Sequence, residues 1–327
     1  MLINIVYIIV GVALVLWGAD RLTEGASSLA RGLHVPEIVI GLTIVAAGTS
    51  APELFVSMVS AFKGTSDLAV GNVLGSNIFN TMLIVGCSAV VAPMAVAPST
   101  VKKDIPFAVV ASFLLFMLCF DDMDSPHLWG NEISRSDGII LLIGFLIFMI
   151  YTFQSAKKEG LMPTEEELEE NSELPKDYSK LWRNLSFIVL GLACLIIGSN
   201  LFVDAASYVA YRYGVRQSVV GLTIVAGGTS LPELATSVVA AYKGRSAIAI
   251  GNVLGSNVFN ILLVLGMTAV VHPMRIMGIT IVDLMMMLVS VGILWLFAYT
   301  KYSVSRREGV LLILGFLAYM GWLLYLL

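Results

Sequence analysis

Two polar segments occur twice in this amino-acid sequence, at a fixed spacing. Residues 41–54 read GLTIVAAGTSAPEL and residues 221–234 read GLTIVAGGTSLPEL. Residues 71–80 read GNVLGSNIFN and residues 251–260 read GNVLGSNVFN. Both pairs lie 180 positions apart, because 221 − 41 and 251 − 71 are both 180. The chain is therefore a tandem duplication, and a fold built from it must contain two copies of one unit.

The composition of the chain is that of a protein embedded in a lipid bilayer. Hydrophobic residues make up 58% of the chain and charged residues 13%, whereas a soluble domain has about a quarter charged residues. The net charge of −4 does not favour nucleic-acid binding. We expect the bilayer as the main partner, with no nucleic acid and no obligate protein partner. The sequence shows no soluble ATPase module, so a primary pump is not expected.

The apolar runs predict an all-α polytopic membrane protein with ten transmembrane helices. Each span needs roughly 20 mostly apolar residues. The ten candidate spans lie at about 3–28, 36–62, 69–92, 105–120, 136–153, 184–211, 216–242, 248–271, 277–299 and 308–327. The first run lacks the basic start and the cleavage site of a signal peptide, so it is interpreted as a retained span.

The positive charges between the spans predict the orientation. Placing the N-terminus outside puts fourteen of the nineteen Lys and Arg residues on the inner side. The remaining five are Lys63, Arg135, Arg212, Arg216 and Arg275. Because positive loops stay inside, the sequence predicts a multi-pass protein of the plasma or inner cell membrane with both termini outside.

An odd number of spans in each copy predicts that the two copies are inverted. The first five-helix repeat is expected at 1–153, a polar acidic cytoplasmic linker at 154–183 and the second repeat at 184–327. With five spans each, the second repeat enters the membrane from the side opposite to the first. Inverted repeats with a site at the bilayer midplane are typical of secondary transporters that work by alternating access.

Proline interrupts the helix that carries the first duplicated segment. Pro52 has no N–H and crowds the preceding turn, so we expect the helix to be kinked or broken there, and Pro232 predicts the same in the second copy. Irregular backbone at membrane depth is tolerated where it is buried in protein or lines a cavity. The break therefore predicts backbone carbonyl groups that face an internal site.

The polar side chains of the duplicated segments share helix faces, since they are spaced three, four or seven residues apart. Inversion would bring these faces together at the centre of the protein. The candidate ligands are Ala46, Thr49, Ser50, Glu53, Ser76 and Asn80, with Ala226, Thr229, Ser230, Glu233, Ser256 and Asn260. This set offers oxygen atoms and no paired His or Cys, which suits hard cations such as Ca²⁺, Mg²⁺ and Na⁺. No cofactor is expected.

The segments GTSAPEL with GNVLGSNIFN, and GTSLPEL with GNVLGSNVFN, resemble the paired alpha-repeats of the cation/calcium exchanger superfamily, in its prokaryotic sodium/calcium exchanger branch. This resemblance implies extrusion of Ca²⁺ driven by Na⁺, with both ions as transported substrates. It implies that Glu53 and Glu233 bind the ions directly and that Thr49 and Thr229 contribute backbone carbonyls. It further implies that the Ala46, Ser50 and Ser76 positions and their second-copy equivalents help to bind Na⁺, and that spans one and six slide against the other helices.

One position departs from the family pattern, and several functions stay open. Several sodium/calcium exchangers have Asp where this chain has Asn260, so the site carries one less potential negative charge. The same fold could therefore exchange H⁺ for Ca²⁺, or Na⁺ for another divalent cation. Midplane oxygens also suit a cation channel. An intramembrane hydrolase using Ser50 or Ser230 is disfavoured, because no His or Lys base recurs beside either serine. We expect a transporter and not an enzyme.

Overall fold

Helices make up almost all of the described chain. The computed structural model describes residues 2–32, 35–119, 131–158, 178–214, 226–276 and 278–326. In the first half the elements are α1 (Leu2–Gly32), α2 (Glu37–Ile40), η1 (Gly41–Val45), α3 (Ala46–Thr49), α4 (Ala51–Phe62), α5 (Ser66–Ile78), η2 (Phe79–Ile84), α6 (Val85–Val91), β1 (Met94–Ala95), η3 (Thr100–Asp104), α7 (Ile105–Leu118), β2 (Asn131–Ile133) and α8 (Arg135–Lys158). The η elements are π-helical turns that continue the α-helices around them.

The second half repeats this order. Its elements are α10 (Tyr178–Arg212), α12 (Ala226–Thr229), α13 (Leu231–Tyr242), α14 (Ser246–Val258), η6 (Phe259–Leu265), α15 (Gly266–Val271), β3 (Met274–Ile276), α16 (Ile281–Lys301), β4 (Ser303–Val304) and α17 (Arg306–Leu326). Two short antiparallel pairs, β1 with β4 and β2 with β3, join connections of opposite halves. The expected linker at 154–183 is partly helical, because α8 extends to Lys158 and α10 begins at Tyr178; its middle lies outside the described residues.

The helical elements identify a polytopic membrane protein. Seven helices among the described residues are long and apolar enough to cross a membrane, and the number is eight if the bent pair Glu37–Thr49 and Ala51–Phe62 forms one span. Two predicted spans are not in this set. In the span expected at 105–120, the helix begins earlier, at Pro98, and its first turns carry charged residues. The span expected at 216–242 is described only from Ala226.

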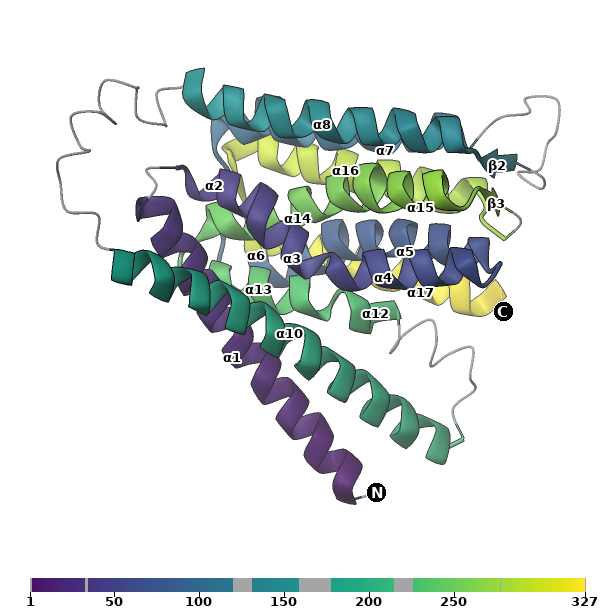
Figure 1. Cartoon of the computed structure of the whole chain (residues 1–327), viewed down its shortest axis with the longest axis horizontal. Coiled ribbons are helices and arrows are strands. Elements are labelled where there is room, and N and C mark those ends of the chain that lie inside the picture. Colours follow the sequence, from purple (N-terminus) through teal and green to yellow (C-terminus); the bar gives the residue numbers. More distant parts are fainter. Residues whose placement is uncertain are drawn as a thin grey trace.

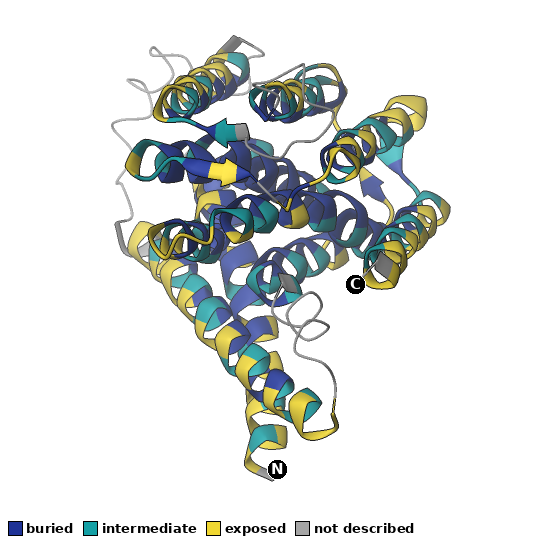
Figure 2. Cartoon of the chain, turned by 90° about the vertical axis from the view of Figure 1, so that its right-hand side faces the viewer, coloured by how far each residue is buried: buried dark blue, intermediate teal, exposed yellow. Residues whose placement is uncertain are grey.

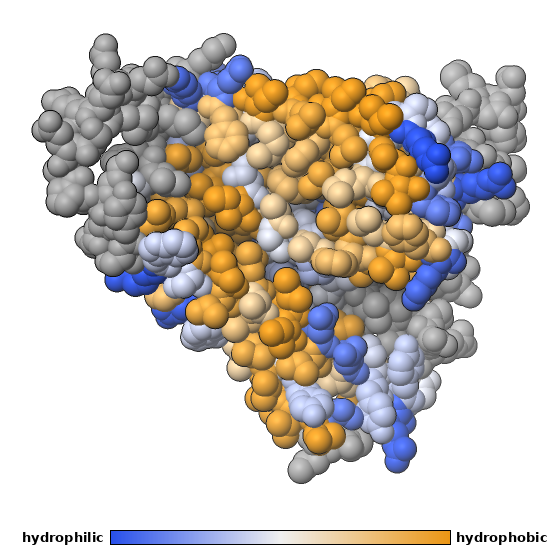
Figure 3. Space-filling model, viewed as in Figure 1, coloured by the Kyte–Doolittle hydropathy of each residue, from blue (hydrophilic) through white to orange (hydrophobic). Residues whose placement is uncertain are grey.

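The helices of the duplicated GNVLGSN segments form the centre of the bundle (Figures 1 and 2). In the most apolar window of Ser246–Val271, 94% of the residues are buried, and the value for Ser66–Val91 is 72%. The corresponding value is only 22% for Ile3–Gly32 and 17% for Arg306–Tyr325. Exposed apolar surface of this extent is unfavourable in water, so the outer helices are suited to contact with lipid. Figure 3 shows hydrophobic residues across the middle of one face and hydrophilic residues toward the two ends of the helices.

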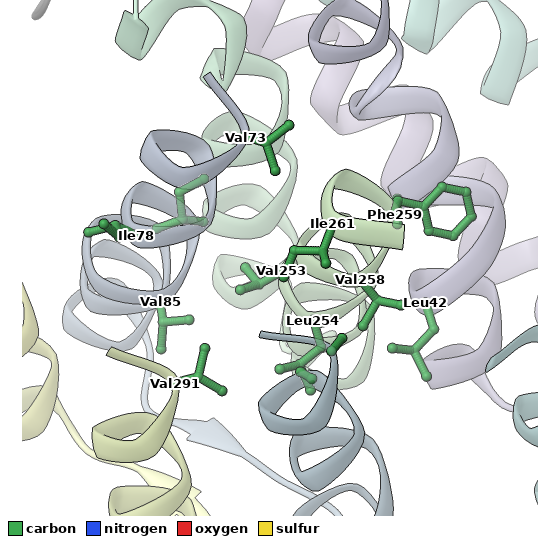
Figure 4. Packing of buried hydrophobic residues seen from close by; sticks show 14 of the residues in the cluster. Leu42, Val73, Ile78, Val85, Val253, Leu254, Val258, Phe259, Ile261 and Val291 are labelled. Atoms are coloured by element: carbon green, nitrogen blue, oxygen red, sulfur yellow. The ribbon is translucent and has the colours of Figure 1, made fainter. Parts of the chain in front are cut away.

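Close packing of α14 against η1 and α3 joins the two halves. A Cβ atom added to Gly255 would lie 2.6 Å from the Leu42 carbonyl oxygen and 2.7 Å from the Cβ of Ala46. Only glycine allows the two backbones to approach so closely. Val258 of α14 lies beside Leu42 in the surrounding apolar core (Figure 4). This contact places η1 and α3 of the first half against α14 of the second half.

Glycines also join α1 to α10, which lie side by side, with one end of the pair extending away from the bundle (Figure 1). A Cβ atom on Gly18 would lie 2.7 Å from the Gly191 carbonyl oxygen, and one on Gly11 would lie 2.8 Å from that of Gly198. The order of these contacts makes the pair antiparallel. Because backbone meets backbone at both levels, α1 and α10 pack as one tight two-helix unit.

Ion pairs connect α1 and α2 to the second half. The Asp20 carboxylate of α1 lies 3.1 Å from Arg21 and 2.6 Å from the ammonium group of Lys243, which follows α13. Glu37 at the start of α2 pairs with Arg245 at 3.1 Å. The unit of α1 and α10 is therefore held against the bundle by charged contacts as well as by packing.

We predict that Gly18→Val destabilises the protein, because the added side chain forces α1 away from α10. Overpacking of this kind costs about 1–3 kcal/mol. Thermal unfolding of the purified protein in detergent measures the loss as a lower Tm. Gly292→Val in α16 is the matched control, since a Cβ at Gly292 meets nothing within 4 Å. Equal Tm values for the two variants would contradict the close contact.

Candidate cation site

The first-half helix is broken at Ser50. α3 ends at Thr49, Ser50 has φ −81° and ψ 4°, and α4 begins at Ala51 with a bend of 45°. Pro52 occupies the first turn of α4, where no N–H is needed within the helix. The predicted break is confirmed, and it lies two residues before the proline because proline fits well at a helix start.

The second half contains the same break. α12 ends at Thr229, Ser230 has φ −91° and ψ 10°, and α13 begins at Leu231. Both glutamates consequently lie in the first turn of a helix, Glu53 in α4 and Glu233 in α13. The free N–H groups and the positive end of the helix dipole stabilise negative charge at this position. The break thus places each carboxylate where the backbone supports it.

Each carboxylate is hydrogen-bonded by a serine of the other half. The Ser230 hydroxyl donates to Glu53 Oε1 at 3.0 Å, and the Ser50 hydroxyl donates to Glu233 Oε1 at 3.2 Å. Both serines are the residues before a helix, where serine ordinarily accepts a bond from its own helix. Neither makes this capping bond. Their hydroxyls instead hold the opposite carboxylate, and all four side chains are buried.

Further hydroxyl groups surround the two carboxylates. The Thr49 and Ser256 side chains lie close enough to Glu233 to influence its carboxyl group, and Thr229 lies similarly close to Glu53. The Thr49 hydroxyl lies 3.1 Å from the Val45 carbonyl oxygen and 3.5 Å from the Ser256 hydroxyl. Both threonines and three of the serines, Ser50, Ser230 and Ser256, are therefore gathered around the two acidic groups.

The two asparagines that end the GSNxFN segments are fully buried in π-helical turns. Asn80 lies in η2 and Asn260 in η6, both with 0% exposure. Neither amide oxygen nor amide nitrogen of these side chains has a hydrogen-bond partner among the described residues, and the same is true of Oε2 in Glu53 and Glu233. Buried polar atoms without partners are costly, and most proteins satisfy them. Four buried oxygens are thus available to a cation.

The other candidate ligands lie on the same elements. Ser76 is 4% exposed in α5, and Ala46 is the fully buried first residue of α3. Ala226 begins α12, and its side chain lies outside the described residues, as do 221–225. The side-chain groups at this site offer carboxylate, amide and hydroxyl oxygens, which hard cations such as Ca²⁺ and Na⁺ prefer. The backbone carbonyl of Ala46 is not free as the break led us to expect, because it accepts the Ser50 N–H at 2.9 Å.

Reasoning from the sequence missed two asparagines next to this site. Asn72 donates to the Glu53 carbonyl oxygen at 3.4 Å, and Asn252 donates to that of Glu233 at 3.4 Å. Both lie in the duplicated GNVLGSN segments, 180 residues apart, so their recurrence was a usable signal. They differ from Asn80 and Asn260 in that they hydrogen-bond the backbone of the acidic helices.

Comparisons with known proteins agree with this arrangement. The family described as sodium/calcium exchanger protein matches residues 3–154 and 184–325. The inner membrane protein YrbG of Escherichia coli strain K12 is 36% identical over 100% of this chain and 98% of its own length. The sodium/calcium exchanger MaX1 of Methanosarcina acetivorans is 30% identical over 99% of each chain. A solved structure of the sodium-calcium exchanger NCX_Mj has a TM-score of 0.82 at 29% identity, covering 98% of this chain and 99% of that one. The chain belongs to the sodium/calcium exchanger family.

We predict that Ca²⁺ raises the Tm of the purified protein and that Glu53→Gln or Glu233→Gln removes this effect. A ligand that binds only the folded state at one hundred times its Kd stabilises by about 2.7 kcal/mol. Glu24→Gln, which neutralises a glutamate paired with Arg21 on the surface, is the matched control and keeps the Ca²⁺ response. A Ca²⁺-dependent shift that persists in both buried variants would place the cation elsewhere.

Proposed function

We propose that this chain is a secondary antiporter that exchanges Na⁺ for Ca²⁺ across the cell membrane. The observation that carries the proposal is the pair of buried carboxylates, Glu53 and Glu233, each held by a serine of the opposite half. Oε2 of each carboxylate and the amide oxygens of Asn80 and Asn260 are buried and lack hydrogen-bond partners among the described residues. A charged, oxygen-lined centre inside a membrane protein is costly and marks an ion path.

Charge balance explains how two different ions can compete for one site. Glu53 and Glu233 together carry two negative charges when ionised, which neutralise one Ca²⁺ ion or two Na⁺ ions. The amide oxygens of Asn80 and Asn260 can complete the coordination of either ion without adding charge. Since both ions need the same two carboxylates, occupation by one excludes the other, and that exclusion is the basis of exchange.

The proposed transport cycle uses ten membrane spans arranged as two inverted five-helix repeats. In such proteins broken helices line a midplane site, and one group of helices moves against the other. The unit of α1 and α10 suits the moving group, because its helices pack tightly on each other through Gly18 and Gly191. The names of MaX1 and NCX_Mj describe sodium/calcium exchangers, which supports the assignment of the substrates.

We predict that Na⁺-loaded proteoliposomes diluted into Na⁺-free buffer take up ⁴⁵Ca²⁺. Glu53→Gln and Glu233→Gln each lower the initial rate by at least about 100-fold, since an oxygen ligand and a negative charge are lost together. Glu24→Gln retains the wild-type rate. Radioactivity retained on filters, with equal pH on both sides, measures the uptake.

Two results would overturn this assignment. Uptake of ⁴⁵Ca²⁺ that is independent of internal Na⁺ and depends on a pH gradient would identify H⁺ as the driving ion. Na⁺-driven transport of another divalent cation in place of Ca²⁺ would retain the fold and change the substrate. Single-channel currents in a planar bilayer would instead indicate a cation channel.

We further predict that both termini lie outside and that the 154–183 linker lies inside. Alkaline phosphatase, which folds only outside the inner membrane, is expected to be active when fused after residue 327 and inactive when inserted within the linker. Green fluorescent protein in the same positions should give the opposite pattern. Equal phosphatase activity at the two positions would contradict the orientation and the ten-span plan.

A further inference from the structure

Asn252 hydrogen-bonds the helix that carries Glu233 at two points. Its amide nitrogen donates to the Glu233 carbonyl oxygen at 3.4 Å and to the Ser237 hydroxyl at 3.0 Å. Glu233 and Ser237 are one helical turn apart, so both bonds fall on one face of α13. Asn72 makes the equivalent bonds in the first half, to the Glu53 carbonyl oxygen at 3.4 Å and the Ser57 hydroxyl at 3.1 Å.

The same Asn252 side chain also reaches the broken helix of the first half. Its amide oxygen lies 3.1 Å from the Thr49 hydroxyl, which can donate to it. Asn252 has 0% exposure, and both ends of its amide are bonded. One buried side chain therefore connects the last residue of α3 with the first turn of α13.

Comparison with Asn260 separates two roles for asparagine in this region. The Asn260 amide is buried without any hydrogen-bond partner among the described residues and is therefore available to an ion. The Asn252 amide, only eight residues earlier, uses its nitrogen and its oxygen for protein contacts. An amide whose nitrogen and oxygen both bond the protein is less available to a cation, and it fixes the positions of the groups that it bonds.

We propose that Asn252 is a positioning residue that holds Glu233 and Thr49 in register with each other in the cation site, and that Asn72 holds the first turn of α4 in the same way for Glu53. This inference rests on the proposed function, because the groups that are held are the proposed ion ligands. The two breaks belong to opposite halves, and nothing covalent fixes their separation. Asn252 supplies that connection through hydrogen bonds beside the carboxylate, leaving the carboxylate itself free for the ion.

The first test is transport by Asn252→Leu, which keeps a similar side-chain volume and removes all three bonds. The KM for Ca²⁺ is expected to rise about tenfold, because each buried hydrogen bond contributes a fold-change of roughly two to ten. The maximal rate is expected to change less than the KM. Asn77→Leu is the matched control: Asn77 is 1% exposed and donates to the Asn257 carbonyl oxygen, but it does not bond the acidic helices.

A double-mutant cycle tests whether Asn252 acts through Thr49. Thr49→Val removes the hydroxyl and keeps the backbone carbonyl of residue 49. If the two residues act through their shared contact, the combined effect of Asn252→Leu and Thr49→Val on the KM is smaller than the product of the two single effects. If the KM of the double variant instead rises by the product of the two single fold-changes, Asn252 and Thr49 act independently and the connection between them is contradicted.

Hydrogen exchange gives a readout that does not depend on the transported ion. In Asn252→Leu, the amides of 231–237 are expected to exchange at least about fivefold faster, whereas Asn77→Leu leaves them unchanged. Unchanged exchange together with an unchanged KM would overturn the positioning role. If the wild type moves no Ca²⁺ under any gradient, the proposed function fails, and the exchange rates still decide whether Asn252 holds the first turn of α13.

Discussion

Two of the hydrogen bonds between the halves, from Ser230 to Glu53 and from Ser50 to Glu233, are the contacts on which the candidate site depends. Carboxylates deep in a membrane protein need partners, because burial without them is very costly. Ser50 and Ser230 each bond the glutamate of the other half. A single copy of the repeat therefore lacks these two bonds.

The cost of this centre is balanced by the packing around it. Each serine gives up its usual capping bond, and Asn80 and Asn260 bury amides that have no partner among the described residues. The missing capping bonds and the unpartnered amides both lower the stability of the fold at the site. The core helix α14 compensates with close backbone contact at Gly255 and with the apolar cluster around Leu42. Close packing around the candidate site thus encloses a polar interior in which several groups lack partners among the described residues.

The sequence predicted the elements that depend on local chemistry better than the contacts between halves. Hydropathy located most of the described apolar helices. Pro52 predicted a break, which lies at Ser50 because proline is accommodated in the first turn of the new helix. The fixed offset of 180 paired Glu53 with Glu233. It could not show which serine faces which carboxylate, nor that Asn252 spans the two breaks, since these contacts arise from tertiary packing. The π-helical turns at Asn80 and Asn260 also have no signature in residue spacing.

The two copies are chemically similar at the centre and differ outside it. Asp20, within α1, pairs with Lys243 at 2.6 Å. The position equivalent to Lys243 is Lys63, but the position equivalent to Asp20 is Asn200, so the same ion pair cannot form in the other copy. A partly exposed ion pair contributes about 0–1 kcal/mol, which corresponds to a population ratio of up to about five. The two arrangements of a duplicated site therefore need not have equal free energy. In the proposed alternating-access cycle, an ion pair outside the site would bias which side of the membrane the site faces.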